Sequence, residues 1–206
     1  MKKIFAFVIG GLLSASAWSQ GYSDQDSDYS FRTIVSVATG KAELEDVEGD
    51  VDMHSLSVAL DFDRLPVEAE LRYSNMQNTY TYSTYVDDML VDQEKVDGNI
   101  DNIGVSAKLD LSWNCKEACA YLIAGYNMGE VSADYSENGE KLGSYSTDAN
   151  YAHFGAGFRY DFSSNMRASI EYLQYNIGEQ ELDDTGGVEI DFGNATAWQA
   201  GIGYRF

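Results

Sequence analysis

Basic residues are scarce in this chain. Lysine and arginine number 13 against 34 aspartates and glutamates, which gives a formal net charge of −21 at pH 7. Nucleic acids are bound largely through lysine and arginine, so this balance excludes them as expected partners. Proline is nearly absent, with Pro66 alone, while 19 glycines accompany 15 tyrosines. This composition is typical of long strands and tight turns, not of a disordered acidic chain.

Long apolar runs are absent as well. The most apolar stretch, Ile4 to Leu13, is shorter than the roughly 20 residues that a membrane-spanning helix needs. Two lysines precede it and Ala15-Ser-Ala17 follows it, the pattern of a cleaved export signal. We predict a signal peptide over residues 1–17 and an acidic extension over 18–28, leaving a mature charge of −23 (11 basic minus 34 acidic residues). Any membrane insertion must then use strands, which span lipid only as a closed barrel.

Only two cysteines are present, Cys115 and Cys119, within one short turn. Export to an oxidising compartment favours a disulfide between them. Metal binding by the two thiolates is the alternative, but no histidine or further cysteine lies nearby in the sequence to complete such a site. We therefore predict a small disulfide-closed loop, with no metal and no cofactor.

Eight stretches alternate apolar and polar residues with a period of two, as membrane strands do. In one of them apolar residues alternate with Glu68, Glu70 and Arg72, which a lipid-facing surface would not tolerate, so these three must point into a barrel. The stretch 121–128 is apolar on both faces, so the sequence leaves open its phase, that is, which of its residues point into the barrel. The stretches are 29–39, 55–62, 67–74, 102–113, 121–128, 152–162, 166–172 and 198–206. They predict an all-β fold, an eight-stranded antiparallel transmembrane β-barrel over residues 29–206.

The connections between these stretches alternate in length. Those after the second, fourth and sixth stretches are short, and the others are longer and acidic, like periplasmic turns and external loops. Two outer connections continue to alternate, at residues 78–82 and at 131–135 before the turn Asn138-Gly139, so we expect tall hairpins above the bilayer. Their edges would be unpaired, and we expect their dense acidic residues to discourage edge-to-edge association.

The chain closes with Ala200-Gly-Ile-Gly-Tyr-Arg-Phe206, an alternating strand that ends in an aromatic residue. With the export signal and the eight strands, this ending resembles the small, porin-like outer-membrane barrels of the OmpA and OmpX type. The resemblance covers the mature chain by pattern. It implies a monomer in the bacterial outer membrane, in contact with lipid and lipopolysaccharide. It also implies that the barrel-assembly machinery recognises Ile202, Tyr204 and Phe206.

Both signs of charge occur on the face that points inward. Eight strands leave an interior just wide enough for side chains, which favours a static network of ion pairs that fills the lumen. The alternative is a gated ion path in which Glu68 or Glu70 exchanges partners with Lys108 or Arg72, as proposed for similar barrels. The inward charged residues are Arg32, Asp61, Glu68, Glu70, Arg72, Lys108, Asp110, Arg159, Asp161, Arg167, Glu171 and Arg205.

The outer loops are acidic, chiefly at residues 43–52 and 181–191. We interpret them as solvated surfaces, and a second hypothesis is that divalent cations bridge their carboxylates to lipopolysaccharide. Some similar barrels modify lipid A with histidine and serine, but Gly155 stands where that pattern has serine after His153, and His54 lies at a strand end. Catalysis is therefore not expected.

The sequence thus predicts an outer-membrane barrel with an envelope-structural or surface-interaction role through its acidic external loops. A narrow porin with a charged lumen is the alternative. A lipid A-modifying enzyme is a third interpretation, which the histidine pattern does not support. Inward charges also argue against a vacant apolar lumen for small ligands.

Overall fold

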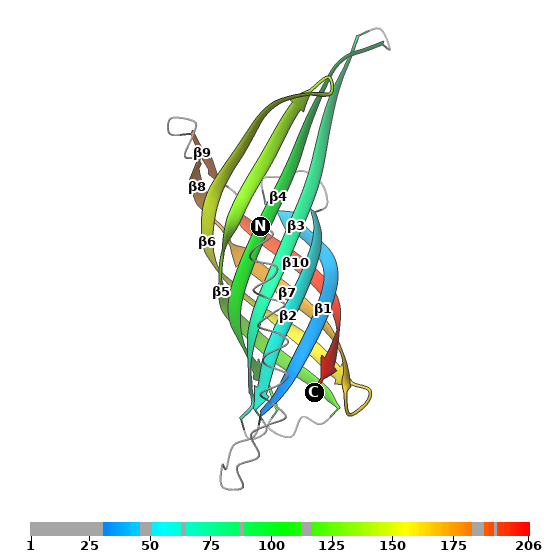
Figure 1. Ribbon diagram of the computed structural model, residues 1–206, viewed down its shortest axis with the longest axis vertical. Coiled ribbons are helices and arrows are strands. Elements are labelled where there is room, and N and C mark those ends of the chain that lie inside the picture. Colours follow the sequence, from blue (N-terminus) through cyan, green and yellow to red (C-terminus); the bar gives the residue numbers. More distant parts are fainter. Residues whose placement is uncertain are drawn as a thin grey trace.

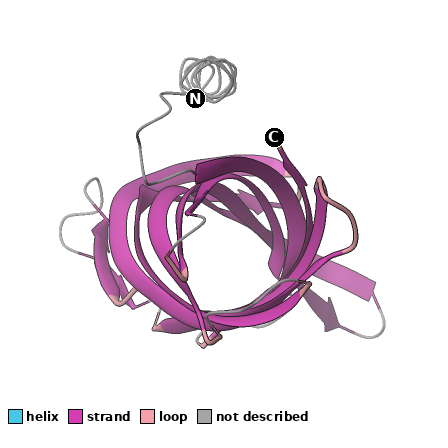
Figure 2. Cartoon of the chain, turned by 90° about the horizontal axis from the view of Figure 1, so that it is seen from below, coloured by secondary structure: helices cyan, strands magenta, loops and turns pink. Residues whose placement is uncertain are grey.

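The fold is a closed antiparallel barrel of eight strands with a small hairpin beside it (Figure 1, Figure 2). The computed structural model describes residues 31–45, 51–62, 65–86, 89–112, 117–182, 188–191 and 193–206. The ring has the order β1-β10-β7-β6-β5-β4-β3-β2, and β8 pairs with β9. The strands are β1 (Phe31–Leu44), β2 (Val51–Phe62), β3 (Val67–Val86), β4 (Met89–Asp110), β5 (Ala118–Glu137), β6 (Glu140–Asp161), β7 (Met166–Asn176), β8 (Glu179–Leu182), β9 (Val188–Asp191) and β10 (Asn194–Arg205). The predicted eight-stranded barrel is confirmed.

Several sequence predictions lie outside the described residues. These are the signal peptide and the acidic extension, residues 1–28, together with Tyr29 and Cys115. Cys119 is buried near the start of β5, and its disulfide with Cys115 stays a prediction. No helix in the described part of the chain is long and apolar enough to cross a membrane.

Side chains alternate between the outside and the interior along the barrel strands. The outward side chains are apolar and exposed, with Val37 at 59% and Ile202 at 55% exposure. An apolar surface of this extent is unfavourable in water, so it forms a belt suited to lipid. Near the end where short turns join β2 to β3 and β6 to β7, the belt includes the exposed aromatic residues Tyr160, Phe162 and Tyr204.

The structure decides the phase of β5, which the sequence left open. Tyr121 and Ile123 point into the barrel at 1% and 3% exposure, whereas Leu122 is 48% exposed. In the ladder Tyr121 lies opposite Gly157 of β6, and Ile123 lies opposite Gly155. Because a glycine has no side chain, Gly157 leaves room for the Tyr121 ring inside the barrel. Which residues of β5 point into the barrel therefore depends on the glycines of the neighbouring strand β6.

Strands β3 to β6 continue beyond the level at which the barrel closes, and in Figure 1 they rise above the other strands. Pairing of β2 with β3 ends at Asp52–Gln77, while β4 remains paired with β5 as far as Glu94–Glu137. The expected tall hairpins are therefore joined into one sheet, here named the projecting sheet (residues 78–86, 89–98 and 132–148). Our expectation of unpaired edges on both hairpins is wrong for β4 and β5, which cover each other.

The last strand closes the barrel against the first. β10 pairs with β1, and beyond it the backbone amide of Phe206 donates to the carbonyl of Thr33 (3.0 Å). The side chains of Ile202, Tyr204 and Phe206 are exposed on the outer surface, and the last two rings lie 4.8 Å apart. Their recognition by an assembly machinery stays a prediction.

Candidate functional site

The interior of the barrel is divided into two layers of different chemistry. Ionisable side chains fill the half nearer the short turns. The half nearer the projecting sheet is mainly apolar, with the buried polar residues Asn102, Asn127 and His153 among its side chains. The first half is here named the charged layer, and its members occupy inward positions of the two-residue alternation. They are Asp61 of β2, Glu68, Glu70 and Arg72 of β3, Lys108 and Asp110 of β4, Arg159 and Asp161 of β6, Arg167 and Glu171 of β7, and Arg205 of β10.

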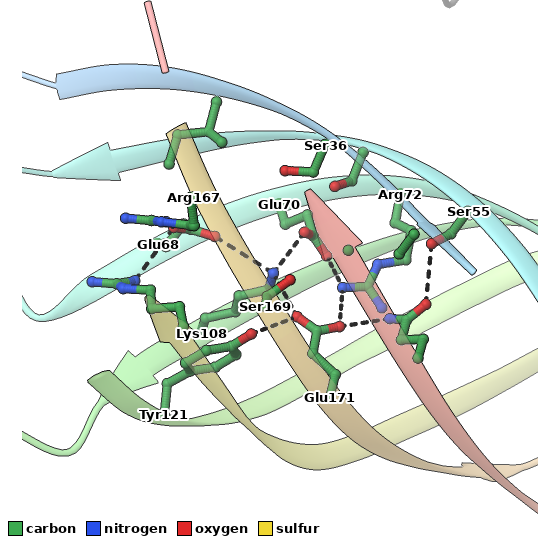
Figure 3. Close-up of a pocket in the computed structure, with 16 residues that line it drawn as sticks. Ser36, Ser55, Glu68, Glu70, Arg72, Lys108, Tyr121, Arg167, Ser169 and Glu171 are labelled. Atoms are coloured by element: carbon green, nitrogen blue, oxygen red, sulfur yellow. Dashed lines mark hydrogen bonds and ion pairs between the residues drawn. The ribbon is translucent and has the colours of Figure 1, made fainter. Parts of the chain in front are cut away.

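Glu171 is the centre of the charged layer (Figure 3). One of its carboxylate oxygens accepts from Arg72 (2.6 Å) and Gln199 (2.6 Å). The other oxygen accepts from Tyr121 (2.8 Å) and pairs with Lys108 (2.9 Å). Glu171 is only 3% exposed, and these donors replace the water that burial removes.

Glu70 binds the same two cations from β3. Its carboxylate oxygens lie 2.6 Å from Arg72 and 2.7 Å from Lys108, and Ser106 donates a further hydrogen bond (3.3 Å). Arg72 and Lys108 are thus each held between Glu70 and Glu171. Buried charges are tolerated when they are paired and hydrogen-bonded in this way.

Glu68 connects this centre to the ion pairs nearer the short turns. It lies 3.5 Å from Lys108, 3.4 Å from Arg159 and 2.6 Å from Arg167. Arg159 also binds Asp110 at 2.6 Å. The network therefore runs without a break from the middle of the lumen toward the end of the barrel.

Asp161 and Asp61 form the rim of the charged layer. Asp161 binds Arg167 (2.7 Å) and Arg205 (2.6 Å), and Asp61 lies 3.4 Å from Arg167. Arg32 differs from the sequence-based expectation, because it is exposed near the start of β1, where it lies opposite Asp61 in the ladder.

The charged layer is filled by side chains. It contains nearly equal numbers of cations and carboxylates. The cations are Arg72, Lys108, Arg159, Arg167 and Arg205, and the carboxylates are Asp61, Glu68, Glu70, Asp110, Asp161 and Glu171. The cavity among them measures about 20 Å³, roughly the room for one water molecule. The arrangement favours the static network over an open ion path.

The second half of the lumen is here named the apolar layer, and it was not predicted from the sequence. Met53, Met76 and Ile100 are between 0% and 5% exposed, and the rings of Tyr151 and Tyr175 meet edge to face at 5.9 Å. The other members are Ala42, Leu44, Val51, Val131, Ala149, Leu173, Ile177, Ala195 and Ala197. The sequence did contain an indication of this layer. Met76 and Ile100 lie an even number of residues from the inward charges on their own strands, so they point to the same side of the strand.

The two histidines do not share a site. His153 points inward, with Nδ1 2.8 Å from Asn127 Nδ2 and its ring 5.7 Å from that of Tyr175. His54 is exposed on the outer side of β2, 3.1 Å from the Thr39 hydroxyl. The two rings thus make separate contacts, one with an asparagine and one with a threonine, and the absence of lipid A chemistry stays a prediction.

The cation hypothesis for the loops gains no support from the part of the chain that the structure describes. Its histidine, cysteine and acidic side chains form no group of three or more that could hold a metal ion. Residues 46–50 and 183–187, which carry part of the hypothesis, lie outside the described residues.

Substituting Gly157→Ala is expected to destabilise the barrel by about 1–3 kcal/mol, because overpacking a filled interior forces side chains out of position. A Cβ at this position would lie 2.5 Å from the ring of Tyr121, which donates to Glu171. Urea unfolding of the refolded protein measures the change. Gly143→Ala is the matched control on the same strand, since its Cβ would meet ordinary contacts of 3.4 Å or more. Equal stability of the two variants would contradict the packing argument.

A closed barrel with an apolar belt outside and paired charges inside defines a membrane-spanning β-barrel protein. Residues 5–206 match the family described as "Outer membrane protein beta-barrel domain", and the chain belongs to this family of the bacterial outer membrane. No curated protein matches the chain in sequence.

Solved structures of small outer-membrane barrels are similar to this chain in fold. Neisserial surface protein A has 16% identity and a TM-score of 0.60, covering 87% of this chain and 100% of that one. A major outer membrane protein from Thermus thermophilus has 12% identity and a TM-score of 0.63, covering 86% and 100%. Ail, the attachment invasion locus protein of Yersinia pestis, has 16% identity and a TM-score of 0.50, covering 85% and 97%.

Proposed function

We propose that this outer-membrane protein acts at the cell surface through the projecting sheet, as a surface-interaction or envelope-structural protein, and not by passing solutes through its lumen. The observation that carries the proposal is the continuation of β3–β6 as one paired sheet beyond the closed barrel. A barrel needs no such extension to span the bilayer. The extension therefore supports a role outside the membrane.

The outer face of the projecting sheet, with the strand positions just below it, is acidic. Neighbouring strands place carboxylates directly opposite one another in the rows Asp101–Glu130–Asp148 and Asp97–Asp134. Hydrogen bonds from Lys95 and Thr79 lower the pKa of Asp97, and hydrogen bonds from Ser144 and Lys141 lower the pKa of Asp134. These two groups therefore stay ionised at any physiological pH, and the face favours basic partners.

The inner face of the projecting sheet is mostly uncharged. It carries Tyr80, Val96 and Tyr135 in one cross-strand row, with Tyr145 in the next row. Tyr80 is 39% exposed and Tyr145 is 41% exposed. Partly exposed tyrosines supply large contact areas with a polar end, which makes them frequent at protein interfaces.

The filled lumen supports a surface role over the narrow porin. Two layers lie in series along the barrel axis, and ions would have to cross both the charged layer and the apolar layer. Two of the structurally similar proteins are named for surface location or attachment, which agrees with the proposal at the level of fold. Lipid, lipopolysaccharide and the assembly machinery remain the expected partners of the barrel itself.

Removing residues 78–98 or 132–148 is expected to abolish surface binding while leaving the barrel able to fold, because the membrane part keeps its own ladders. The measurement is adhesion of expressing cells to a cultured epithelial monolayer, with heat-modifiable gel mobility as the folding check. Removing the β8–β9 segment, residues 179–191, is the control and should leave adhesion unchanged. Equal adhesion by all three variants would refute the role of the projecting sheet.

A further inference from the structure

Among the residues that the structure describes, no strand pairs with one side of the upper part of β3, which is therefore a sheet edge. From Asn78 to Val86 this strand pairs with β4, and its ladder with β2 has already ended at Gln77. Natural edges are usually protected by charges, prolines or bulges. Residues 74–86 include no charged residue and no proline, and the register shift in this ladder comes only at Thr84/Tyr85, near the tip. The acidic residues that we expect to discourage association lie on the adjacent strand β4 and not on this edge itself.

We propose that the free edge of β3 pairs antiparallel with the same edge of a second copy anchored in a facing membrane. This inference rests on the proposed surface function and names its partner. Each edge then satisfies the backbone donors and acceptors that the other leaves open, so two projecting sheets become one continuous sheet.

The direction of β3 explains why the second copy lies in a facing membrane. β3 runs from the short-turn end of the barrel toward the tip of the projecting sheet, and every copy in one membrane has this direction (Figure 1). Two copies side by side in one membrane could pair only in parallel, which is slightly less stable per residue. Antiparallel pairing requires a copy that points the opposite way, and a facing membrane supplies it.

The side chains of the edge are complementary to themselves. Thr79 and Thr81 lie on one face of β3, and Tyr80 lies on the other. A two-fold axis at Thr81 would place Thr81 opposite Thr81 and Tyr80 opposite Tyr82 of the other copy, pairs that stabilise neighbouring strands.

Charge also favours a second copy as the occupant. The chain carries a net charge of −21, so two copies repel each other wherever acidic residues meet. The edge of β3 is uncharged, whereas the next strand carries Glu94 and Asp97. A basic partner would bind the acidic outer face in preference to this edge. An equally acidic copy meets little charge repulsion at this uncharged edge.

Clustering of vesicles tests the proposal. Wild-type protein refolded into phosphatidylcholine vesicles of two colours is expected to cluster them, measured as two-colour coincidence. Thr81→Asp and Thr81→Lys should each reduce clustering to the level of protein-free vesicles, because like charges meet across the two-fold axis. Mixing Thr81→Asp vesicles with Thr81→Lys vesicles should restore clustering, since opposite charges now face each other.

Ser136→Asp and Ser136→Lys are the matched controls. Ser136 belongs to the same cross-strand row as Thr81 through Lys95, but it lies on β5 inside the sheet, so both variants should cluster like the wild type. Absence of wild-type clustering, normal clustering by the Thr81 variants, or no recovery on mixing would overturn the proposal. Energy transfer between labelled copies within single unclustered vesicles would also overturn it, by indicating parallel pairing in one membrane. Retained adhesion to epithelial cells by Thr81→Asp alongside any of these results would leave the proposed surface function standing.

Discussion

Glu171→Leu is expected to lower the free energy of unfolding of the barrel by about 3–5 kcal/mol, the cost of removing one partner from a buried ion pair. Arg72 and Lys108 would each keep Glu70, and Lys108 would also keep Glu68, but Arg72 would be left with a carboxylate that it shares with Lys108. Tyr121 and Gln199 would lose their acceptor in the same step. Urea unfolding of the refolded protein in micelles measures the loss.

Lys95→Ala provides the contrast, because its ion pair with Asp97 is exposed. Exposed pairs contribute about 0–1 kcal/mol, so this variant should unfold close to the wild type. The double variant Glu171→Leu/Arg72→Leu should lose less than the sum of the two single variants, since neither change then leaves the other group unpaired. A loss below about 1 kcal/mol for Glu171→Leu would mean that the charged layer is not an energetic unit.

Planar bilayers containing the wild-type barrel are expected to show no resolved current steps. Bilayers containing the Lys108→Ala variant should also show none. Removing Lys108 disrupts the charged layer, but the apolar layer still closes the lumen. Adding Tyr151→Ala and Tyr175→Ala removes the edge-to-face ring pair from that layer and should produce small current steps. Conduction thus requires both layers to be opened.

The folding of each variant is checked by heat-modifiable gel mobility, because a barrel that has not folded would also give no current. Tyr80→Ala with Tyr145→Ala on the projecting sheet is the matched control, because these partly exposed tyrosines lie above the closed lumen. Current steps from the wild type that vanish in Lys108→Ala would contradict our account and favour the gated ion path.

Strand alternation predicted most of the charged layer from local information. Glu68, Glu70 and Arg72 occupy every second position, between apolar residues. In a barrel that is surrounded by lipid, such charged side chains must point into the interior. The partners of Glu171 could not be assigned this way. Arg72 lies on β3, Tyr121 on β5 and Gln199 on β10, and only closure of the ring brings them to one carboxylate.

The apolar layer and the projecting sheet show where local pattern is insufficient. Met53 and Tyr175 lie on β2 and β7, yet the Tyr175 hydroxyl is 3.9 Å from the Met53 sulfur across the lumen. The pairing of β4 with β5 beyond the barrel likewise depends on a register that neither hairpin contains by itself.

The sequence by itself determined the fold class, the number of barrel strands and the direction of most side chains. Lipid requires apolar and polar residues to alternate along each strand, and this alternation can be recognised in a single segment of the sequence. The tertiary structure decided the phase of β5, the division of the lumen into two layers, and which edge of the projecting sheet is left open. These features depend on which strands are neighbours and in what register, and such long-range pairings have no counterpart in the pattern of any one segment.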